Sequence, residues 1–400
     1  MEPFSLYLHI PFCRHRCSYC DFNTYAGLES SIARYVRALC VEAEIVAKKA
    51  ERRLPVHTVF FGGGTPSLLP TNLIRQILET LKSRFEFTGE VEITLEANPE
   101  GLSRHYLAEL HDLGVNRLSI GMQSAQPDEL RLLERRHDYF TMKAAVENAR
   151  RAGFTNLNLD LIFGLPSQSL ESWQQTLRLA VGLGPEHLSL YCLTLEHGTP
   201  LAKWVWRGLL PEPDEDLAAD MYEWSSAFLR AKGYHQYEIS NWARDNGAGL
   251  VRTCRHNLQY WRGCPYLGLG AGAHGFAGGC RTVNVRSPLA YTQRLVEDDS
   301  EGVHSGGDFP RTPATLESLE IDRATEMNET MLMGLRLTEE GVSKKGFYRR
   351  FGCQLEEVYG REITTLRREG LLEFAPPDHD RLRLTPRGRL LGNRVFVHFV

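Results

Sequence analysis

The first two hundred residues alternate short, β-rich apolar runs with longer segments in which apolar residues recur at helical period. This alternation is typical of strands and helices that follow one another. Six strands are predicted, over Leu6–Ile10, Thr58–Phe61, Glu92–Glu96, Arg117–Ile120, Asn156–Ile162 and His187–Leu195. Helices are predicted between them, over Ser30–Arg52, Leu73–Phe85, Arg104–Leu113, Thr141–Ala152 and Leu170–Leu183.

Repeated strand–helix units indicate an α/β fold in which the helices surround a parallel sheet. Six such units suggest a partial (β/α)6 barrel. Because a complete barrel of this kind has eight units, the sheet is expected to stay partly open. Loops that follow parallel strands gather at the carboxyl ends of those strands, so the functional site is expected at that edge.

The pattern changes after residue 200. Gly, Trp, Tyr and His accumulate there, so residues 201–313 are expected to form an elaboration that closes the barrel and ends in a Gly-, Pro- and Ser-rich linker, Glu301–Pro313. Helical patterns resume over Leu316–Arg336 and Leu355–Arg368, and residues 370–388 follow in the order strand, turn, strand. The chain is therefore expected to have a barrel over residues 1–200, the elaboration, and a winged-helix-like module over residues 314–400.

Composition and charge narrow the function classes. Hydrophobic residues make up 42% and charged residues 24% of the chain, which is typical of soluble globular proteins. With 46 basic and 50 acidic residues, the overall charge favours no nucleic-acid partner. No apolar run approaches the ~20 residues that cross a bilayer, and the start does not resemble a signal peptide. We expect a cytoplasmic protein without a transmembrane segment, and peripheral membrane contact and homodimerisation stay open.

Three of the nine cysteines lie within eight residues, as Cys13-x3-Cys17-x2-Cys20, directly after the first predicted strand. An odd, clustered set is not a disulfide framework and points to metal or redox chemistry. Three thiolates on one loop can bind three irons of a [4Fe–4S] cluster and leave the fourth iron without a protein ligand. Zinc is the alternative, but structural zinc usually takes four ligands. Tyr19, inside the loop, would shield a cluster from solvent.

Further polar or glycine-rich positions end the next strands. Gly63, Gly64 and Thr65 belong to a turn whose backbone could approach a ligand closely, although an ordinary strand-to-helix turn is the alternative. Polar groups in apolar runs need partners, and a barrel mouth supplies them. Such residues stand at or near the ends of the third, fourth and fifth strands, and each could instead be a structural hydrogen bonder: Glu96, Gln123 and Asp160.

The segment His256-Asn257-x2-Tyr260-Trp261 places a candidate haem ligand beside two aromatic rings. A neutral imidazole is a common axial ligand of haem iron, and aromatic rings can pack on the face of a macrocycle. A solvated or core histidine is the alternative. His256 is therefore a candidate for haem binding.

The cysteine motif resembles the signature of the radical S-adenosylmethionine (radical SAM) superfamily. The segments Tyr7–Cys13 and Cys20–Asn23 resemble more narrowly the oxygen-independent coproporphyrinogen III oxidase family, and especially its haem chaperone branch. The likeness runs through almost the whole chain and includes Gly62–Pro66, Asp160–Pro166, His256–Trp261 and the C-terminal module.

The resemblance implies three cofactors or ligands. Cys13, Cys17 and Cys20 would bind a [4Fe–4S] cluster, SAM would bind its open iron, and His256 would bind haem. Arg136 adjoins Arg135, so a shift of one residue would exchange the two in the comparison. The positions that match SAM contacts are Tyr7, Gly63, Gly64, Thr65, Glu96, Gln123, Arg135 and Asp160.

The function expected from the resemblance is that of a haem chaperone, which holds haem and delivers it to acceptor proteins. Oxygen-independent oxidation of coproporphyrinogen III is the alternative, and a radical SAM methyltransferase is a further one. The oxidase pattern continues with another cysteine two residues after the third, where this chain has Phe22, and this departure disfavours the oxidase. The family context favours a lid or docking role, without nucleic acid, for the winged-helix-like module.

Overall fold

The computed structural model describes residues 3–245, 251–297 and 307–400. The chain forms two compact units, and each combines two segments of the sequence: Met1–Ser225 with Pro265–Glu320, and Ser226–Cys264 with Ile321–Val400. Residues 226–264, which the sequence assigns to the elaboration, thus group with the C-terminal segment. The three domain bounds expected from the sequence stay a prediction.

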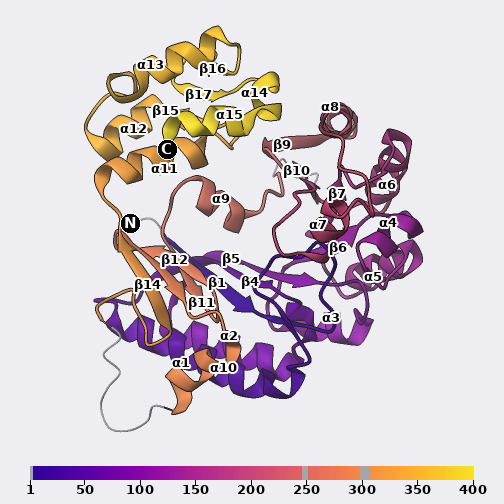
Figure 1. Cartoon of the computed structure of the whole chain (residues 1–400). Helices are drawn as coiled ribbons and strands as arrows, with labels where there is room; N and C mark the ends of the chain where they lie inside the picture. Colours follow the sequence, from indigo (N-terminus) through magenta and orange to yellow (C-terminus); the bar gives the residue numbers. More distant parts are fainter. Residues whose placement is uncertain (1–2, 246–250, 298–306) are drawn as a thin grey trace. The chain divides into compact units, whose positions relative to one another are not determined.

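Six parallel strands form the centre of the first unit, in the spatial order β1, β4, β5, β6, β7, β8 (Figure 1). Each pairs in parallel with the next, so the predicted open arrangement of six strand–helix units is confirmed. Their bounds are β1 Phe4–Ile10, β4 Pro55–Gly63, β5 Glu86–Ala97, β6 Arg117–Gln123, β7 Leu157–Phe163 and β8 His187–Cys192.

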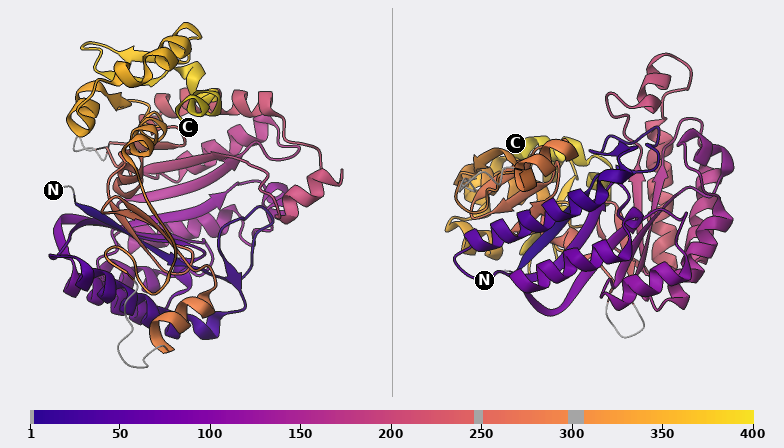
Figure 2. Two further views of the ribbon diagram at one scale, coloured as in Figure 1. Left: turned by 60° about the vertical axis from the view of Figure 1, so that its left-hand side comes forward. Right: turned by 90° about the horizontal axis from the view of Figure 1, so that it is seen from below.

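The connecting helices also agree with the predicted segments, apart from one short additional helix, α4. Their bounds are α1 Ile32–Lys49, α2 Thr71–Arg84, α3 Arg104–Asp112, α4 Pro127–Leu132, α5 Tyr139–Arg151 and α6 Leu170–Gly182. In α1 the buried side chains Ile32, Tyr35, Leu39 and Val46 recur at helical spacing, which gives the helix one apolar face. Helices α1 and α2 lie side by side along the outside of the sheet (Figure 2).

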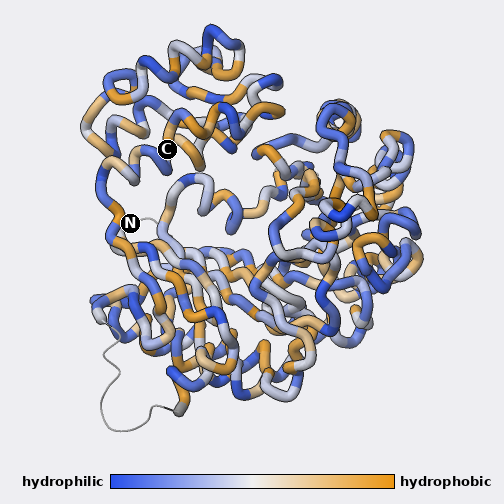
Figure 3. The backbone as a smooth tube through the Cα atoms, in the orientation of Figure 1, coloured by the Kyte–Doolittle hydropathy of each residue, from blue (hydrophilic) through white to orange (hydrophobic). Residues whose placement is uncertain are grey.

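Strands β1, β6 and β7 are buried along nearly their whole length, as expected for a parallel sheet covered by helices, whereas the first half of β5 is exposed or partly exposed. All seven residues of β6 are buried, and in β7 only Asp160 is partly exposed. The outer helices instead alternate hydrophobic and hydrophilic residues along the tube in Figure 3. Polar side chains within these strands must therefore find partners inside the unit, which matters for the site described below.

The first unit continues beyond β1 with strands from the later part of the chain. Strand β11 pairs in parallel with β1, and β12, β13 and β14 follow in antiparallel order. The bounds are β11 Tyr266–Leu269, β12 His274–Ala277, β13 Cys280–Asn284 and β14 Thr315–Glu320, with α7 Pro200–Trp206 and α10 Pro288–Thr292 as further helices. Helix α8, Glu215–Ala231, runs along the chain from the first unit into the second.

The helix predicted over Leu316–Arg336 is wrong in its first part. Leu316 and Leu319 are three residues apart, which suits a helix, but they lie in β14, whose backbone pairs with β13. Helix α11 begins only at Arg323, where the side chain of Asp322 accepts a hydrogen bond from the Thr325 amide. Pairing with a neighbouring strand thus overrode a short helical pattern. Residues 301–306 of the expected linker lie outside the described residues.

The second unit contains the predicted winged-helix-like order of helices and strands. A three-stranded sheet, β15-β17-β16, packs with helices around a core that includes Phe347, Phe351, Leu355 and Ile363. The bounds are β9 Tyr234–Glu238, β10 Asn241–Arg244, α9 Arg255–Trp261, α11 Arg323–Gly334, β15 Val342–Ser343, α12 Lys344–Phe351, α13 Leu355–Arg368, β16 Leu372–Ala375, β17 Arg381–Leu384, α14 Pro386–Leu390 and α15 Gly392–Phe396. In the part of the chain that the structure describes, no helix is long and apolar enough to cross a membrane.

Candidate functional site

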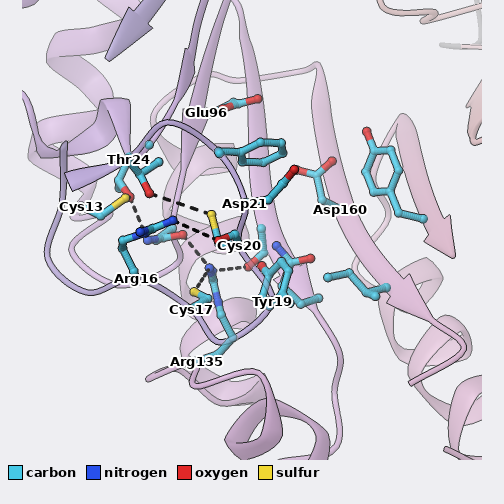
Figure 4. Close-up of a pocket in the computed structure, with 18 of the residues that line it drawn as sticks. Cys13, Arg16, Cys17, Tyr19, Cys20, Asp21, Thr24, Glu96, Arg135 and Asp160 are labelled. Carbon is cyan, nitrogen blue, oxygen red and sulfur yellow. Dashed lines mark hydrogen bonds between the residues drawn. The ribbon is translucent and has the colours of Figure 1, made fainter. Parts of the chain in front are cut away.

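A cavity of about 360 Å³ opens at the carboxyl ends of the parallel strands in the first unit (Figure 4). Figure 4 shows the three clustered cysteines on one side, with Glu96 and Asp160 facing the same space. Most of the residues singled out in the sequence line this cavity: Cys13, Cys17, Tyr19, Cys20, Gly63, Gly64, Thr65, Glu96, Gln123, Arg135 and Asp160. Two of them do not line it, Tyr7 and His256.

The cysteine loop is fixed at its base and in its middle. Cys13 ends the short strand β2 (Phe12–Cys13), which pairs in parallel with β3 (Tyr25–Ala26) and closes the loop. The Ser18 hydroxyl donates a 2.7 Å hydrogen bond to the Leu132 carbonyl at the end of α4. Neither anchor uses a cysteine thiol, because the first is made by backbone pairing and the second by the Ser18 hydroxyl.

None of the three thiols is in a disulfide, and each has a polar neighbour. The Thr65 hydroxyl donates to Cys13 Sγ at 3.5 Å, the Arg135 guanidinium donates to Cys17 Sγ at 3.6 Å, and Thr24 Oγ1 lies 4.0 Å from Cys20 Sγ. Burial raises the pKa of Cys13 and of Cys20. Metal binding to these sulfurs would therefore release protons, because thiolates are the metal-binding form.

The donor set fits an iron–sulfur cluster better than a single ion. Within residues 3–245, 251–297 and 307–400, no three His, Cys, Asp or Glu side chains are arranged around one point as a single metal ion requires. In a cubane cluster each thiolate binds a different iron, so three separate sulfurs facing one cavity suit it. Structural zinc would ask for four ligands around one centre.

The Gly-rich turn after β4 is shaped by contacts with the cysteine loop and its approach. The Gly64 amide donates to the Ile10 carbonyl at 2.9 Å, and the Thr65 amide donates to the Phe12 carbonyl at 2.8 Å. A Cβ atom on Gly64 would lie 2.7 Å from the Phe12 carbonyl oxygen. The close approach that requires glycine at Gly64 is therefore made to the chain's own backbone.

Two carboxyl groups face the cavity, Glu96 from β5 and Asp160 from β7, and β6 lies between these two strands. Burial, reinforced by the nearby Asp160, raises the pKa of Glu96 to about 8. Burial also raises the pKa of Asp160, whose carboxyl accepts hydrogen bonds from Ser119 at 3.0 Å and Asn158 at 2.9 Å. Burial is the larger cause of the shift and the like charge of Asp160 the smaller one, and both favour the protonated form of Glu96.

Gln123, the last residue of β6, and Arg135, three residues after the end of α4, also line the cavity. Gln123 ends β6 with a φ of 63°, in the left-handed region, next to an irregularity in the pairing with β7. Of the adjacent arginines, Arg135 lines the large cavity and Arg136 does not. Although burial disfavours the charged guanidinium, the neighbouring Tyr19 and Cys17 raise the pKa of Arg135 above its usual value.

Asn98 is a cavity residue that the sequence analysis missed. Its Oδ1 accepts a 2.8 Å hydrogen bond from Arg135, and its Nδ2 donates to Thr65 Oγ1 at 3.3 Å. The sequence did offer a signal in the position of Asn98, which is the first residue after β5 and lies two residues after the singled-out Glu96, at the edge where the site was expected.

Tyr7 does not line the cavity but contacts a residue that supports the cysteine loop. Its hydroxyl is 3.0 Å from His9 Nδ1, and His9 Nε2 is 3.0 Å from the Asn23 carbonyl oxygen near the end of the cysteine loop. Burial raises the pKa of Tyr7 above its usual range. In the structure Tyr7 therefore supports the loop through His9, and its contact with SAM stays a prediction.

His256 belongs to the second unit, in helix α9. Its side chain is only 2% exposed, and Nε2 lies 2.9 Å from the Tyr260 hydroxyl oxygen. Trp261 follows Tyr260 in the sequence, and the centre of its ring lies 4.4 Å from the Arg336 guanidinium carbon in a cation–π contact. Nε2, one of the two ring nitrogens that can bind iron, thus has a hydrogen-bonding neighbour, and haem binding by His256 stays a prediction.

Comparison with known proteins places this arrangement in a family. Residues 7–180 match the model of the radical SAM superfamily, and residues 321–391 match that of the HemN C-terminal domain. A protein of Mycobacterium tuberculosis named "Heme chaperone HemW" is 39% identical over 98% of this chain and 94% of its own length. The chain belongs to the HemW family of radical SAM proteins.

Other relatives of this HemW-family chain agree. The Bacillus subtilis "Heme chaperone HemW" is 37% identical, with 99% of both chains covered. The solved structure of coproporphyrinogen III oxidase (HemN) from Escherichia coli matches with a TM-score of 0.79 and 25% identity, covering 99% of this chain and 90% of that one. The predicted partial radical SAM barrel with a C-terminal module is therefore confirmed.

Proposed function

We propose that this chain binds a [4Fe–4S] cluster, SAM and haem, and that it transfers haem to acceptor proteins. The observation that carries the proposal is the whole-chain similarity, at 37% and 39% identity, to proteins named haem chaperone. The cavity supports it, because the three thiols of the cysteine motif share its lining with the carboxyl groups of Glu96 and Asp160 and with the Arg135 guanidinium. A cytoplasmic location and partners other than nucleic acid belong to the same proposal.

The residues that line the cavity suit the chemistry of the [4Fe–4S] cluster and of SAM. Cys13, Cys17 and Cys20 would bind three irons, which leaves the fourth iron for the amino and carboxylate groups of SAM. When bound, the cluster supplies one-electron redox chemistry. Glu96 and Asp160 could face the cationic groups of SAM.

Haem binding would use the second unit. His256 would bind the haem iron, with Tyr260 and Trp261 as aromatic neighbours. Since the Tyr260 hydroxyl lies at hydrogen-bonding distance from His256 Nε2, ligation of iron by this nitrogen requires that contact to open. The proposal therefore includes a local rearrangement of α9 when haem binds.

The second candidate is an oxygen-independent coproporphyrinogen III oxidase. The specific observation in its favour is the match to the Escherichia coli oxidase over 99% of this chain. Against it stands Phe22, at the position where the oxidase pattern has a further cysteine. We therefore place the chaperone function first.

One experiment separates the two functions. The chain is reconstituted anaerobically with iron and sulfide, then divided between a haem titration and an incubation with SAM, coproporphyrinogen III and a reductant. A chaperone is expected to develop a saturable haem spectrum, to pass haem to an apo-haemoprotein, and to leave coproporphyrinogen unchanged. Decarboxylated porphyrinogen and deoxyadenosine, without a haem spectrum, would replace the chaperone function by the oxidase.

A further inference from the structure

A continuous series of hydrogen bonds joins two of the three clustered cysteines. It starts at Cys17, whose Sγ accepts from Arg135 Nη1 at 3.6 Å, and Arg135 Nη2 donates to Asn98 Oδ1 at 2.8 Å. It continues from Asn98 Nδ2 to Thr65 Oγ1 at 3.3 Å and ends at Cys13, whose Sγ accepts from the Thr65 hydroxyl at 3.5 Å. Asn98 is the central member of this series.

The direction of each bond follows from the groups involved. A guanidinium has only donors, so the Asn98 atom that faces Arg135 must be the carbonyl oxygen. The amide nitrogen then faces Thr65 and donates to its oxygen. Because the Thr65 oxygen accepts from Asn98, its own hydroxyl hydrogen is directed to the remaining neighbour, Cys13 Sγ. Asn98 thus orients both donors that reach the sulfurs.

We propose that Asn98 is a positioning residue that holds Arg135 and Thr65 as hydrogen-bond donors to the Cys17 and Cys13 ligands of the cluster. The inference rests on the proposed [4Fe–4S] site. Hydrogen bonds to cluster sulfurs stabilise the more negative, reduced state, and so they raise the reduction potential. They also hold the ligand side chains in place, which slows loss of the cluster.

The neighbouring contacts show which donor depends most on Asn98. Arg135 Nη2 has a second acceptor, the Gly121 carbonyl at 2.9 Å, so its guanidinium would stay partly fixed without Asn98. The Thr65 hydroxyl would lose the amide donor that directs its hydrogen to Cys13. The larger part of the effect is therefore expected through Thr65 and Cys13.

The test compares wild type with Asn98→Ala after anaerobic reconstitution, in the absence of SAM and haem. Asn116→Ala is the matched control, because Asn116 also bonds to strand β5, through Ile93 and Val91, but has no link to a cysteine in this series. Iron content, the midpoint potential from a dye-mediated titration followed by electron paramagnetic resonance, and the rate of iron release to a chelator are measured. Asn98→Ala is expected to keep its iron, to shift the potential to a more negative value and to release iron several-fold faster, whereas Asn116→Ala matches wild type.

Wild-type potential and release rate in an iron-loaded Asn98→Ala variant would overturn the inference. If Asn98→Ala does not take up iron, the midpoint potentials of Thr65→Val and Thr65→Ser test the inference instead. The valine variant, which lacks the hydroxyl, is expected to shift the potential to a more negative value, and the serine variant to restore it; equal potentials would overturn the inference. A wild-type chain that binds no cluster would instead contradict the proposed function, so the two failures are distinguishable.

Discussion

The Gly63 amide donates a 3.1 Å hydrogen bond to Glu96 Oε2, which ties the Gly-rich turn after β4 to the end of β5. Gly63 has a φ of 107°, so the turn directs its N–H at a carboxyl group that is buried beside Asp160. A protonated Glu96 keeps one oxygen as the acceptor of this bond. The contact therefore does not require a charged carboxylate, and this has a consequence for the pH dependence of stability.

Glu96 is expected to make the free energy of unfolding fall as pH rises. Its pKa is raised from 4.5 to about 8 in the folded chain, so between these values the folded state binds a proton that the unfolded state has released. The contribution is favourable below the unfolded pKa and is lost as pH rises toward the folded pKa, by at most about 1.4 kcal/mol per pH unit. Glu96→Gln keeps an acceptor for Gly63 and removes the titration.

Urea unfolding at several pH values between about 5 and 8 measures this difference. The stability of Glu96→Gln relative to wild type should increase with pH across that window. Glu86→Gln is the control, since Glu86 is exposed at the other end of β5 and should leave the slope unchanged. Parallel pH profiles for wild type and Glu96→Gln would contradict the burial of this titrating group.

Replacement of Cys17 is expected to abolish stable cluster binding without unfolding the chain. Only two sulfurs of the motif remain in Cys17→Ala, whereas the loop keeps its anchors through Ser18 and the β2–β3 pair. Anaerobic reconstitution should give about four irons per chain in wild type and far fewer in the variant. Cys192→Ala is the matched control, because Cys192 lines the same cavity outside the motif and should retain the cluster. Full iron content in Cys17→Ala would disprove the ligand assignment.

Gly63→Ala is expected to be more destabilising than Gly27→Ala, although both glycines have positive φ. A Cβ on Gly63 would lie 2.5 Å from the His9 ring, which the Tyr7 hydroxyl and the Asn23 carbonyl hold on both sides, whereas a Cβ on Gly27 would meet nothing within 4 Å. We expect a loss of about 1 kcal/mol at Gly27 and about 2–4 kcal/mol at Gly63 from denaturant unfolding.

The double variant His9→Ala/Gly63→Ala tests the steric explanation. Removing the ring should relieve part of the clash, so the double variant should lose less stability than the sum of the two single variants. Strict additivity would show that contact with His9 does not cause the difference between the two glycines.

Tyr260→Phe is expected to bind haem more tightly than wild type in a haem titration, because the hydroxyl that lies 2.9 Å from His256 Nε2 is removed.

His256→Ala should weaken or shift the Soret band of bound haem while leaving the iron content of the cluster unchanged. His274→Ala, at a more exposed histidine, is the control and should titrate like wild type. If His256→Ala binds haem normally and only loses about 1–3 kcal/mol of stability, His256 is a structural core residue.

Local pattern was sufficient for much of this protein. The six strands and the helices between them follow from apolar periodicity, and burial on both faces of the sheet enforces that pattern. Cys13, Cys17 and Cys20 lie within one short loop, so their convergence on one cavity needs little long-range information. The site edge was also predictable, because parallel strands all end on the same side.

Only the tertiary structure decided which distant side chains meet. Asn98 lies 33 residues from Thr65 and 37 from Arg135, and strand register brings the three together where β4, β5 and α4 end. Three further findings also came only from the tertiary structure. Residues predicted to be helical form β14, and the close approach at Gly64 is to backbone atoms. His256 is buried, with its Nε2 next to the Tyr260 hydroxyl. All of these findings have the same physical reason. Hydrogen bonds and steric contacts between remote segments depend on the relative positions of whole helices and strands, and the periodicity within one segment carries no information about those positions.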